Sequence, residues 1–252
     1  MGPLRSVVAK LWHRSGLFRQ LRALSLWPKL KRDGFDLAHL STMVETTLGP
    51  LQRDEATMLY GMVRVTRPAT VVEFGFYSGQ SAYNFLRAMD PEARIYSFDV
   101  DPNCANTARL RFGGEPRLKL ILKPMEEFEP EDVDGRTVDF VFIDGSHDFE
   151  GTCETFRRLM PVLAPDAIVA VHDTGTLPRR FFPDGHPYLE QRDRWVDDEY
   201  EGEPGERAFV NWILDEHPEF AQLHLHSRRV HRAGITVLQR TFRLKRPEGA
   251  EG

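Results

Sequence analysis

The stretch VVEFGFYSG at residues 71–79 decides how this chain folds. Residues 70–74 read as a buried strand, and Gly75 and Gly79 read as a tight turn that leads into a helix from Gln80. Glycine makes such turns without steric cost and lets a ligand approach the backbone, while the start of the helix offers free amide donors. The stretch therefore predicts a nucleoside pocket at the carboxyl edge of a parallel sheet.

A second stretch, IYSFDVDP at residues 95–102, restricts the class of ligand that this pocket can bind. It reads as the next strand, and Asp99 at its end is placed to accept hydrogen bonds from both hydroxyls of a ribose. The glycine spacing differs from the G-x-G-x-x-G of dinucleotide-binding folds, and Glu73 would repel a pyrophosphate. A carboxylate at that position can instead pair with the ammonium group of an amino acid, or orient the amides of the turn through water.

Strand and helix patterns alternate through the rest of the chain, which predicts an α/β fold whose parallel strands are joined by right-handed crossovers. Strands are expected near 70–74, 94–99, 117–122, 137–143, 167–171, 221–227 and 235–241, and helices near 52–68, 80–89, 102–111, 150–161 and 206–217. The loop between the last two strands has only about seven residues, so those strands must be antiparallel neighbours. We expect a Rossmann-like seven-stranded sheet, mostly parallel with the last strand antiparallel, and helices on both of its faces.

Composition and charge restrict the cellular location and the kinds of binding partner that we expect. The chain has 252 residues and a formal net charge of −5, and eight of its 33 Lys and Arg side chains lie within residues 1–32, which contain no acidic residue. The remainder is distinctly acidic, which argues against nucleic acid as a partner. Two cysteines form no disulfide framework, and neither a membrane-spanning run nor a signal peptide is recognisable, so we expect a cytoplasmic protein.

Three segments flank or interrupt the predicted domain, which we place at residues 51–243. Residues 1–50 read as a basic helical arm and linker; a contact between subunits of a homo-oligomer or over the active site, a partly ordered tail and, less favoured, a membrane-surface helix are the alternatives. Residues 176–205 form a polar, aromatic insertion that is expected to act as a lid, with a plain surface loop as the alternative. Residues 244–252 read as a disordered tail.

Two further stretches carry polar residues at the ends of predicted strands. VDFVFIDGSHDFEGT (138–152) is an apolar strand that ends in Asp144, with His147 three residues later, and AIVAVHDTG (167–175) ends in His172 and Asp173. Neighbouring parallel strands deliver their carboxyl ends to the same crevice, so these side chains should converge beside the nucleoside. Two carboxylates with imidazoles nearby suit a hard or borderline divalent ion such as Mg²⁺ or Mn²⁺.

Together these motifs resemble the class I methyltransferases that use S-adenosylmethionine (SAM), over roughly residues 52–241. The residues at the ends of the predicted fourth and fifth strands resemble those of metal-dependent small-molecule O-methyltransferases. Both the catechol type and the type that modifies sugars in antibiotic pathways show this resemblance. In the catechol type two aspartates at these positions bind the metal, and the resemblance assigns that role to Asp144 and Asp173, with Thr174 standing where that type has asparagine. In the sugar-modifying type Asp-x-x-His supplies a metal ligand and the general base, which Asp144 and His147 match, and His172 stands where an acid would be.

The resemblance implies methyl transfer from SAM to a hydroxyl of a small molecule, such as a sugar, a phenol or another natural-product intermediate. His147 would remove the proton, and Asp144 and Asp173, with His172 as a third candidate ligand, would hold a divalent metal. His147 as a capping residue, His172 in a structural role and a metal-free role for the two aspartates are the alternatives. The predicted SAM contacts are Glu73, Gly75, Phe76, Tyr77, Ser78, Gly79, Ser81, Asp99, Val100, Met125, Glu126 and Asp144.

Two rival functions stay open at this point. One keeps SAM without the metal, as a transferase to oxygen or nitrogen with His147 alone as base. The other is a non-catalytic protein that keeps the nucleoside fold as a binding scaffold, recruited by the basic arm.

Overall fold

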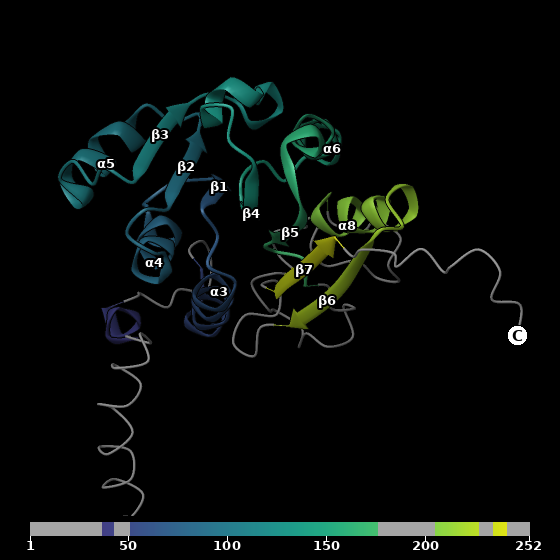
Figure 1. Cartoon of the computed structure of the whole chain (residues 1–252), viewed down its shortest axis with the longest axis horizontal. Helices are drawn as coiled ribbons and strands as arrows, with labels where there is room; N and C mark the ends of the chain where they lie inside the picture. The colour runs from purple at the N-terminus through teal and green to yellow at the C-terminus, as the bar shows by residue number, and fades with distance from the viewer. Residues whose placement is uncertain (1–36, 43–50, 176–204, 227–233, 241–252) are drawn as a thin grey trace, which may run out of the picture. The chain divides into compact units, whose positions relative to one another are not determined.

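The computed structural model in Figure 1 describes residues 37–42, 51–175, 205–226 and 234–240. Contacts divide the chain into two units, Met1–Ser41 and Thr42–Gly252. Nearly all of the described residues of the first unit belong to the short 3-10 helix η1 (Ala38–Thr42). Most of the expected arm, the expected lid insertion as far as residue 204 and the expected C-terminal tail lie outside the described residues and stay predictions.

The second unit is built on one seven-stranded sheet. Its strands are β1 (Thr70–Phe74), β2 (Arg94–Asp99), β3 (Leu118–Leu122), β4 (Val138–Ile143), β5 (Leu163–Val171), β6 (Phe220–His226) and β7 (Gly234–Arg240), in the order β3-β2-β1-β4-β5-β7-β6. The strands from β3 to β5 pair in parallel, and β7 lies antiparallel to both β5 and β6. The predicted fold class is confirmed, including the antiparallel final strand.

Helices fill the crossovers between strands. They are α3 (Arg53–Thr66), α4 (Gln80–Ala88), α5 (Asn103–Phe112), α6 (Phe149–Leu159) and α8 (Gly205–Glu216), with short 3-10 turns η2 (Met125–Glu127), η3 (Pro130–Val133) and η4 (Met160–Val162). Helices α3 and α4 lie on one side of the sheet and α6 and α8 on the other (Figure 1). None of the helices in the described residues combines the length and apolar character that crossing a membrane requires.

The central strands form because most of their residues are apolar. Every residue of β1 is buried, and β4 has one half-buried residue in six. A strand covered by helices on both faces must be apolar at successive positions rather than at alternate ones. The phenylalanines of this core pack edge-on or tilted against one another, as Phe74 does against Phe98 and Phe128.

Strand β5 begins four residues before the predicted start. Leu163 pairs with Val138, but the next regular pair is Ile168 with Phe140, so the strand is irregular between them. Pro165 and Asp166 are exposed there, and proline cannot donate to the sheet. The apolar run becomes continuous only at Ala167, which is why the sequence pattern starts there.

Candidate active site

The turn after β1 brings the first and fourth strands into backbone contact. Gly75 has φ +100°, and a Cβ placed on it would lie 2.0 Å from the carbonyl oxygen of Asp144. The amide of Asp144 in turn donates to the carbonyl of Phe74 at 2.8 Å. Only glycine fits this position, so the glycine that predicted the turn also joins the two strand ends that carry the polar residues.

Asp99 sits beside this turn at the end of β2. Its Oδ2 accepts from the amide of Tyr77 at 2.7 Å, and its Oδ1 accepts from the amide of Asp101 at 2.9 Å. Each carboxylate oxygen keeps a second lone pair, so the side chain is held in place and can still accept from a ligand.

A pocket of about 460 Å³ opens at this edge of the sheet. It is lined by Gly75, Tyr77, Phe98, Asp99, Val100, Lys123, Met125, Glu126, Asp144, Gly145 and Ser146. These residues follow four neighbouring parallel strands, which is where ligands bind in open α/β sheets. Met125, which begins η2, is buried and gives the pocket an apolar contact beside the carboxylates.

Glu73 lies directly behind the pocket and is fully buried. Its carboxyl group accepts a hydrogen bond from the hydroxyl of Ser97. Burial, helped by the charges of Asp144 and Asp99, raises the pKa of Glu73 to about 8, against the opposing hydrogen bonds of Ser81 and Ser97. Near neutral pH the Glu73 side chain is therefore largely protonated, whereas a carboxyl group with the ordinary pKa would be ionised.

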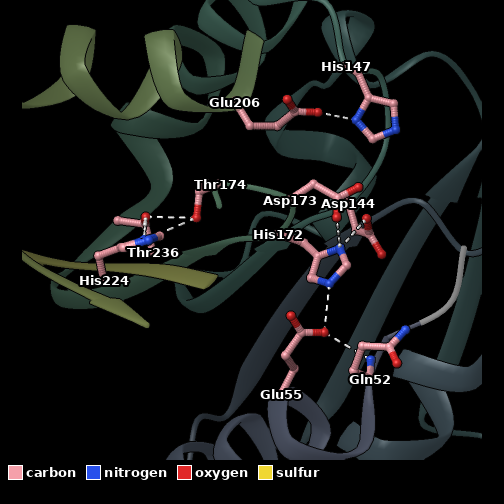
Figure 2. A network of polar contacts seen from close by, with 10 residues as sticks. All are labelled: Gln52, Glu55, Asp144, His147, His172, Asp173, Thr174, Glu206, His224 and Thr236. Carbon is pink, nitrogen blue, oxygen red and sulfur yellow. Dashed lines mark hydrogen bonds and ion pairs between the residues drawn. The ribbon is translucent and has the colours of Figure 1, made fainter. Parts of the chain in front are cut away.

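A second cluster of polar groups stands at the ends of β4 and β5 (Figure 2). The Nδ1 of His172 lies 2.9 Å from Oδ1 of Asp144 and 3.4 Å from Oδ1 of Asp173. One donor atom from each of these three residues falls within 4.8 Å of the others, a spacing that a metal ion can bridge. Asp173 has φ +54°, an uncommon conformation for a non-glycine residue that turns the chain immediately after the strand.

His172 is buried, and its surroundings are acidic. Burial alone would lower its pKa, but the charges of Asp144 and Asp173 and the hydrogen bonds with Asp144 and Glu55 outweigh that effect, so the pKa of His172 is raised well above its ordinary value. The Nε2 of the ring lies 3.0 Å from Oε2 of Glu55, which belongs to α3.

His147 stands beside the cluster, in the loop between β4 and α6, and is hydrogen-bonded through Nδ1 to Oε1 of Glu206 (Figure 2). Glu206 is the second residue of α8 and is buried, which raises its pKa, while the hydrogen bond with His147 acts in the opposite sense. The helix can come this close because its first residue is Gly205, on which a Cβ would lie 2.3 Å from the carbonyl oxygen of His147. A histidine held through Nδ1 presents Nε2 to a reacting group.

The structure brings some of the predicted cofactor contacts together and leaves others outside the pocket. Seven of them line it, namely Gly75, Tyr77, Asp99, Val100, Met125, Glu126 and Asp144. Glu73, Phe76 and Ser81 are buried behind the turn, and Ser78 and Gly79 lie at the start of α4 without lining the pocket.

Thr174, which follows the two polar residues at the end of β5, faces a different group. Its hydroxyl accepts from Thr236 of β7 at 2.9 Å, and Thr236 also contacts His224 of β6. The side chain is therefore engaged with the antiparallel end of the sheet and stands apart from the Asp144 cluster (Figure 2).

Sequence reasoning missed two carboxylates of this site, Glu55 and Glu206. Each lies in the first turn of a helix, where an acid is ordinary because it favours the helix dipole. Glu55 contacts His172, which lies 117 positions away in the sequence, and Glu206 contacts His147, which lies 59 positions away. The sequence signal was the position of each acid on the apolar face of its helix. Glu55 shares its face with Leu59 and Val63, and Glu206 shares its face with Phe209, Val210 and Ile213.

Comparison with known proteins relates the central part of this chain to a family. Residues 72–174 match the sequence profile of a family described as "Methyltransferase domain". This segment, which is less than half of the chain, is thus similar to a methyltransferase domain. The match begins within β1 and ends at Thr174, so it spans both the glycine turn and the cluster of Asp144, His172 and Asp173.

Catechol O-methyltransferases are relatives of this domain in sequence. A stretch of 91 residues is 31% identical to the mouse (Mus musculus) protein and covers 33% of this chain, and 100 residues are 29% identical to the pig (Sus scrofa) protein and cover 36%. The matches span 34% and 53% of those two relatives, about a third and a half of their length.

A solved structure agrees with the fold of the methyltransferase domain. The O-methyltransferase TomG from Streptomyces achromogenes, involved in tomaymycin synthesis and solved in complex with SAM, aligns over 77% of this chain and 82% of its own, with a TM-score of 0.55. Sequence identity is 18%, so this likeness concerns the fold.

Proposed function

We propose that the protein is a SAM-dependent O-methyltransferase that acts on a hydroxyl group of a small molecule, such as a sugar, a phenol or another natural-product intermediate. The observation that carries this proposal is the adjacency of two groups at one edge of the sheet. The pocket beside Asp99 shares Asp144 with the polar cluster, and His147 lies in the loop that follows Asp144. A methyl donor in the pocket would thus lie next to the residues that bind and deprotonate an acceptor.

The pocket suits SAM on three grounds. Asp99 offers carboxylate lone pairs to ribose hydroxyls, Met125 offers a polarisable apolar contact to an adenine ring, and Glu126 can accept from its exocyclic amine. Gly75 gives the backbone room to approach the ligand. Bound SAM supplies a methyl group that its sulfonium already makes electrophilic, so the residues of this chain have to orient the acceptor oxygen and take its proton.

The donor set of the polar cluster fits a divalent cation. Asp144 and Asp173 supply carboxylate oxygens, the ligands that Mg²⁺ prefers, and a donor atom of each lies within 4.8 Å of the others in the group. We assign the metal to these two side chains, with Mg²⁺ or another divalent ion as the occupant. Such an ion would lower the pKa of an acceptor hydroxyl.

His147 is the general base of this proposal. Glu206 accepts the hydrogen of Nδ1, which fixes the tautomer and leaves Nε2 to receive the proton of the acceptor hydroxyl. The acceptor oxygen would bond to the methyl carbon while the bond between that carbon and the sulfur breaks, and the sulfur would keep the electron pair and leave in S-adenosylhomocysteine. The proton of the acceptor oxygen would move to Nε2, and the buried carboxylate of Glu206 would stabilise the developing imidazolium.

A metal-independent transferase to oxygen or nitrogen is the second candidate. It is favoured by the contact of His172 with Asp144, which occupies one of the two carboxylate oxygens that a metal would use. The two candidates differ in their response to chelation.

The test is transfer of a labelled methyl group from SAM to a panel of catechols, other phenols and sugars, with Mg²⁺ and with EDTA. We expect transfer to at least one hydroxylated acceptor, a loss of at least tenfold in rate with EDTA, and recovery on adding Mg²⁺. Transfer that EDTA leaves unchanged would select the metal-independent candidate. Absence of SAM binding would contradict both candidates and favour a scaffold.

A further inference from the structure

Helix α3 reaches the candidate active site through one buried carboxylate. Glu55 is 4% exposed and stands in the first turn of α3, outside the segment 72–174 that matches the methyltransferase profile. Its Oε2 accepts from the amide of Gln52 at 2.9 Å, which closes the capping box of the helix, and lies 3.0 Å from Nε2 of His172. The helix start and the end of β5 are thus joined through one oxygen atom (Figure 2).

Both nitrogen atoms of His172 are engaged in this arrangement. Nε2 faces Glu55 at 3.0 Å, and Nδ1 faces Asp144 at 2.9 Å. Whichever partner carries each proton, a hydrogen bond on both nitrogens uses both positions at which the ring could bind a metal ion. The ring is only 2% exposed, and its backbone amide is held by the carbonyl of Ile143, so it has little freedom to turn away.

We propose that Glu55 is a positioning residue that acts through His172: it fixes the imidazole, and the imidazole holds the carboxylate of Asp144 in one orientation. His172 is committed to this bridge and is not a metal ligand. The contact with Oδ1 of Asp144 thereby fixes how this carboxylate faces the reacting groups. The chain Gln52–Glu55–His172–Asp144 ends at the pocket, which Asp144 lines.

This role explains a feature that a metal site alone does not. A carboxylate and an imidazole are buried together at a contact between elements 117 residues apart, which costs desolvation unless the pair is well bonded. Carboxylate–histidine pairs of this kind commonly orient the group that touches a substrate or a metal.

The inference rests on the proposed function for its catalytic meaning, but the bridge itself can be tested without activity. The first measurement is NMR of the metal-free, full-length protein labelled with ¹⁵N in histidine, with the His172 signals assigned by their absence in His172→Asn. We expect both ring nitrogens of His172 to show hydrogen-bonded signals that persist when Mg²⁺ is added, and the Nε2 signal to shift in Glu55→Gln. Loss of either signal on adding Mg²⁺, or an Nε2 signal that Glu55→Gln leaves in place, would overturn the inference.

The second measurement compares Glu55→Gln with the matched variant Asp54→Asn. Both remove one acidic charge from the first turn of α3 without changing the size of the side chain, but the Asp54 carboxylate accepts from the amide of Glu55, whereas Glu55 contacts His172. We expect Glu55→Gln to lower kcat by about tenfold or more with KM for SAM changed by less than about threefold. Asp54→Asn should stay within about twofold of the wild type.

Equal kcat values for Glu55→Gln and Asp54→Asn would overturn the positioning role. If neither wild type nor variants bind S-adenosylhomocysteine, the proposed function fails, and the histidine signals still decide whether the bridge exists.

Discussion

Gly75 allows two strand ends to lie close together at the pocket, and the reason is steric. A Cβ at this position would overlap the carbonyl oxygen of Asp144 at 2.0 Å, and the φ of +100° is strained for any other residue. We expect Gly75→Ala to lower the free energy of unfolding by about 2–3 kcal/mol or more, and to weaken S-adenosylhomocysteine binding, because the strand ends must separate. Urea denaturation with a calorimetric titration measures both effects.

Gly61 provides the matched control for that change. It lies within α3, and a Cβ there would meet nothing within 4 Å. Alanine favours a helix interior by about 0.5–1 kcal/mol over glycine, so Gly61→Ala should stabilise the protein slightly. Equal losses of stability in the two variants would contradict the steric argument.

Glu73 predicts a dependence of stability on pH. Its pKa is about 8 in the folded protein and near 4.5 when exposed, so between these values the folded state keeps a proton that the unfolded state has released. The free energy of unfolding therefore falls as pH rises through this window, by up to ~1.4 kcal/mol per pH unit from this group, and the effect is absent below it. Glu73→Gln mimics the protonated form, so the variant should gain stability relative to wild type between pH 5 and pH 8.

The measurement for Glu73 is urea denaturation of the ligand-free wild type and Glu73→Gln at several values of pH in that window. The expected gain is a few kcal/mol at the upper end. A difference between the two proteins that stays constant or shrinks as pH rises would show that the folded protein does not hold this proton.

At the scale of elements, helix α6 orients the loop that carries His147. The side chain of Asp148 caps the helix by accepting from the amide of Gly151 at 2.7 Å. Asp148→Ala should cost about 1 kcal/mol of stability, whereas Asp148→Ser keeps an oxygen for the cap and should cost less than half of that. Thermal unfolding of wild type, Asp148→Ala and Asp148→Ser measures the two losses of stability. Equal losses in the two variants would exclude capping as the cause.

The elements themselves were predictable from the sequence for a physical reason. Buried parallel strands have to be apolar at successive positions, so 70–74 and 137–143 stood out as mainly apolar runs. The short loop before the last strand required an antiparallel pair. The beginning of β5 was not predictable, because Pro165 and Asp166 interrupt its pattern. Local composition thus predicts an element wherever burial is uniform along it.

At the scale of the whole molecule, the parallel sheet explains why part of the site was predictable and part was not. Parallel strands deliver their carboxyl ends to one edge, so Asp99, Asp144 and Asp173 could be placed together from strand order alone. Glu55 and Glu206 approach that edge from helices, and the face of a helix that meets a distant strand depends on packing that no local pattern records. The carboxylates that orient the two histidines therefore required the structure.

The most direct test of the account is calorimetric titration of the metal-stripped protein with S-adenosylhomocysteine, for wild type, Asp99→Ala and Asp101→Ala. Asp99 lines the pocket, whereas the Asp101 side chain is exposed and caps the amide of Asn103. We predict binding to wild type, a loss of at least about tenfold in affinity for Asp99→Ala, since each hydrogen bond to a charged group contributes ~1.5–3 kcal/mol, and a change of less than about threefold for Asp101→Ala. No binding to wild type, or equal losses in both variants, would contradict the assignment of this pocket to the methyl donor.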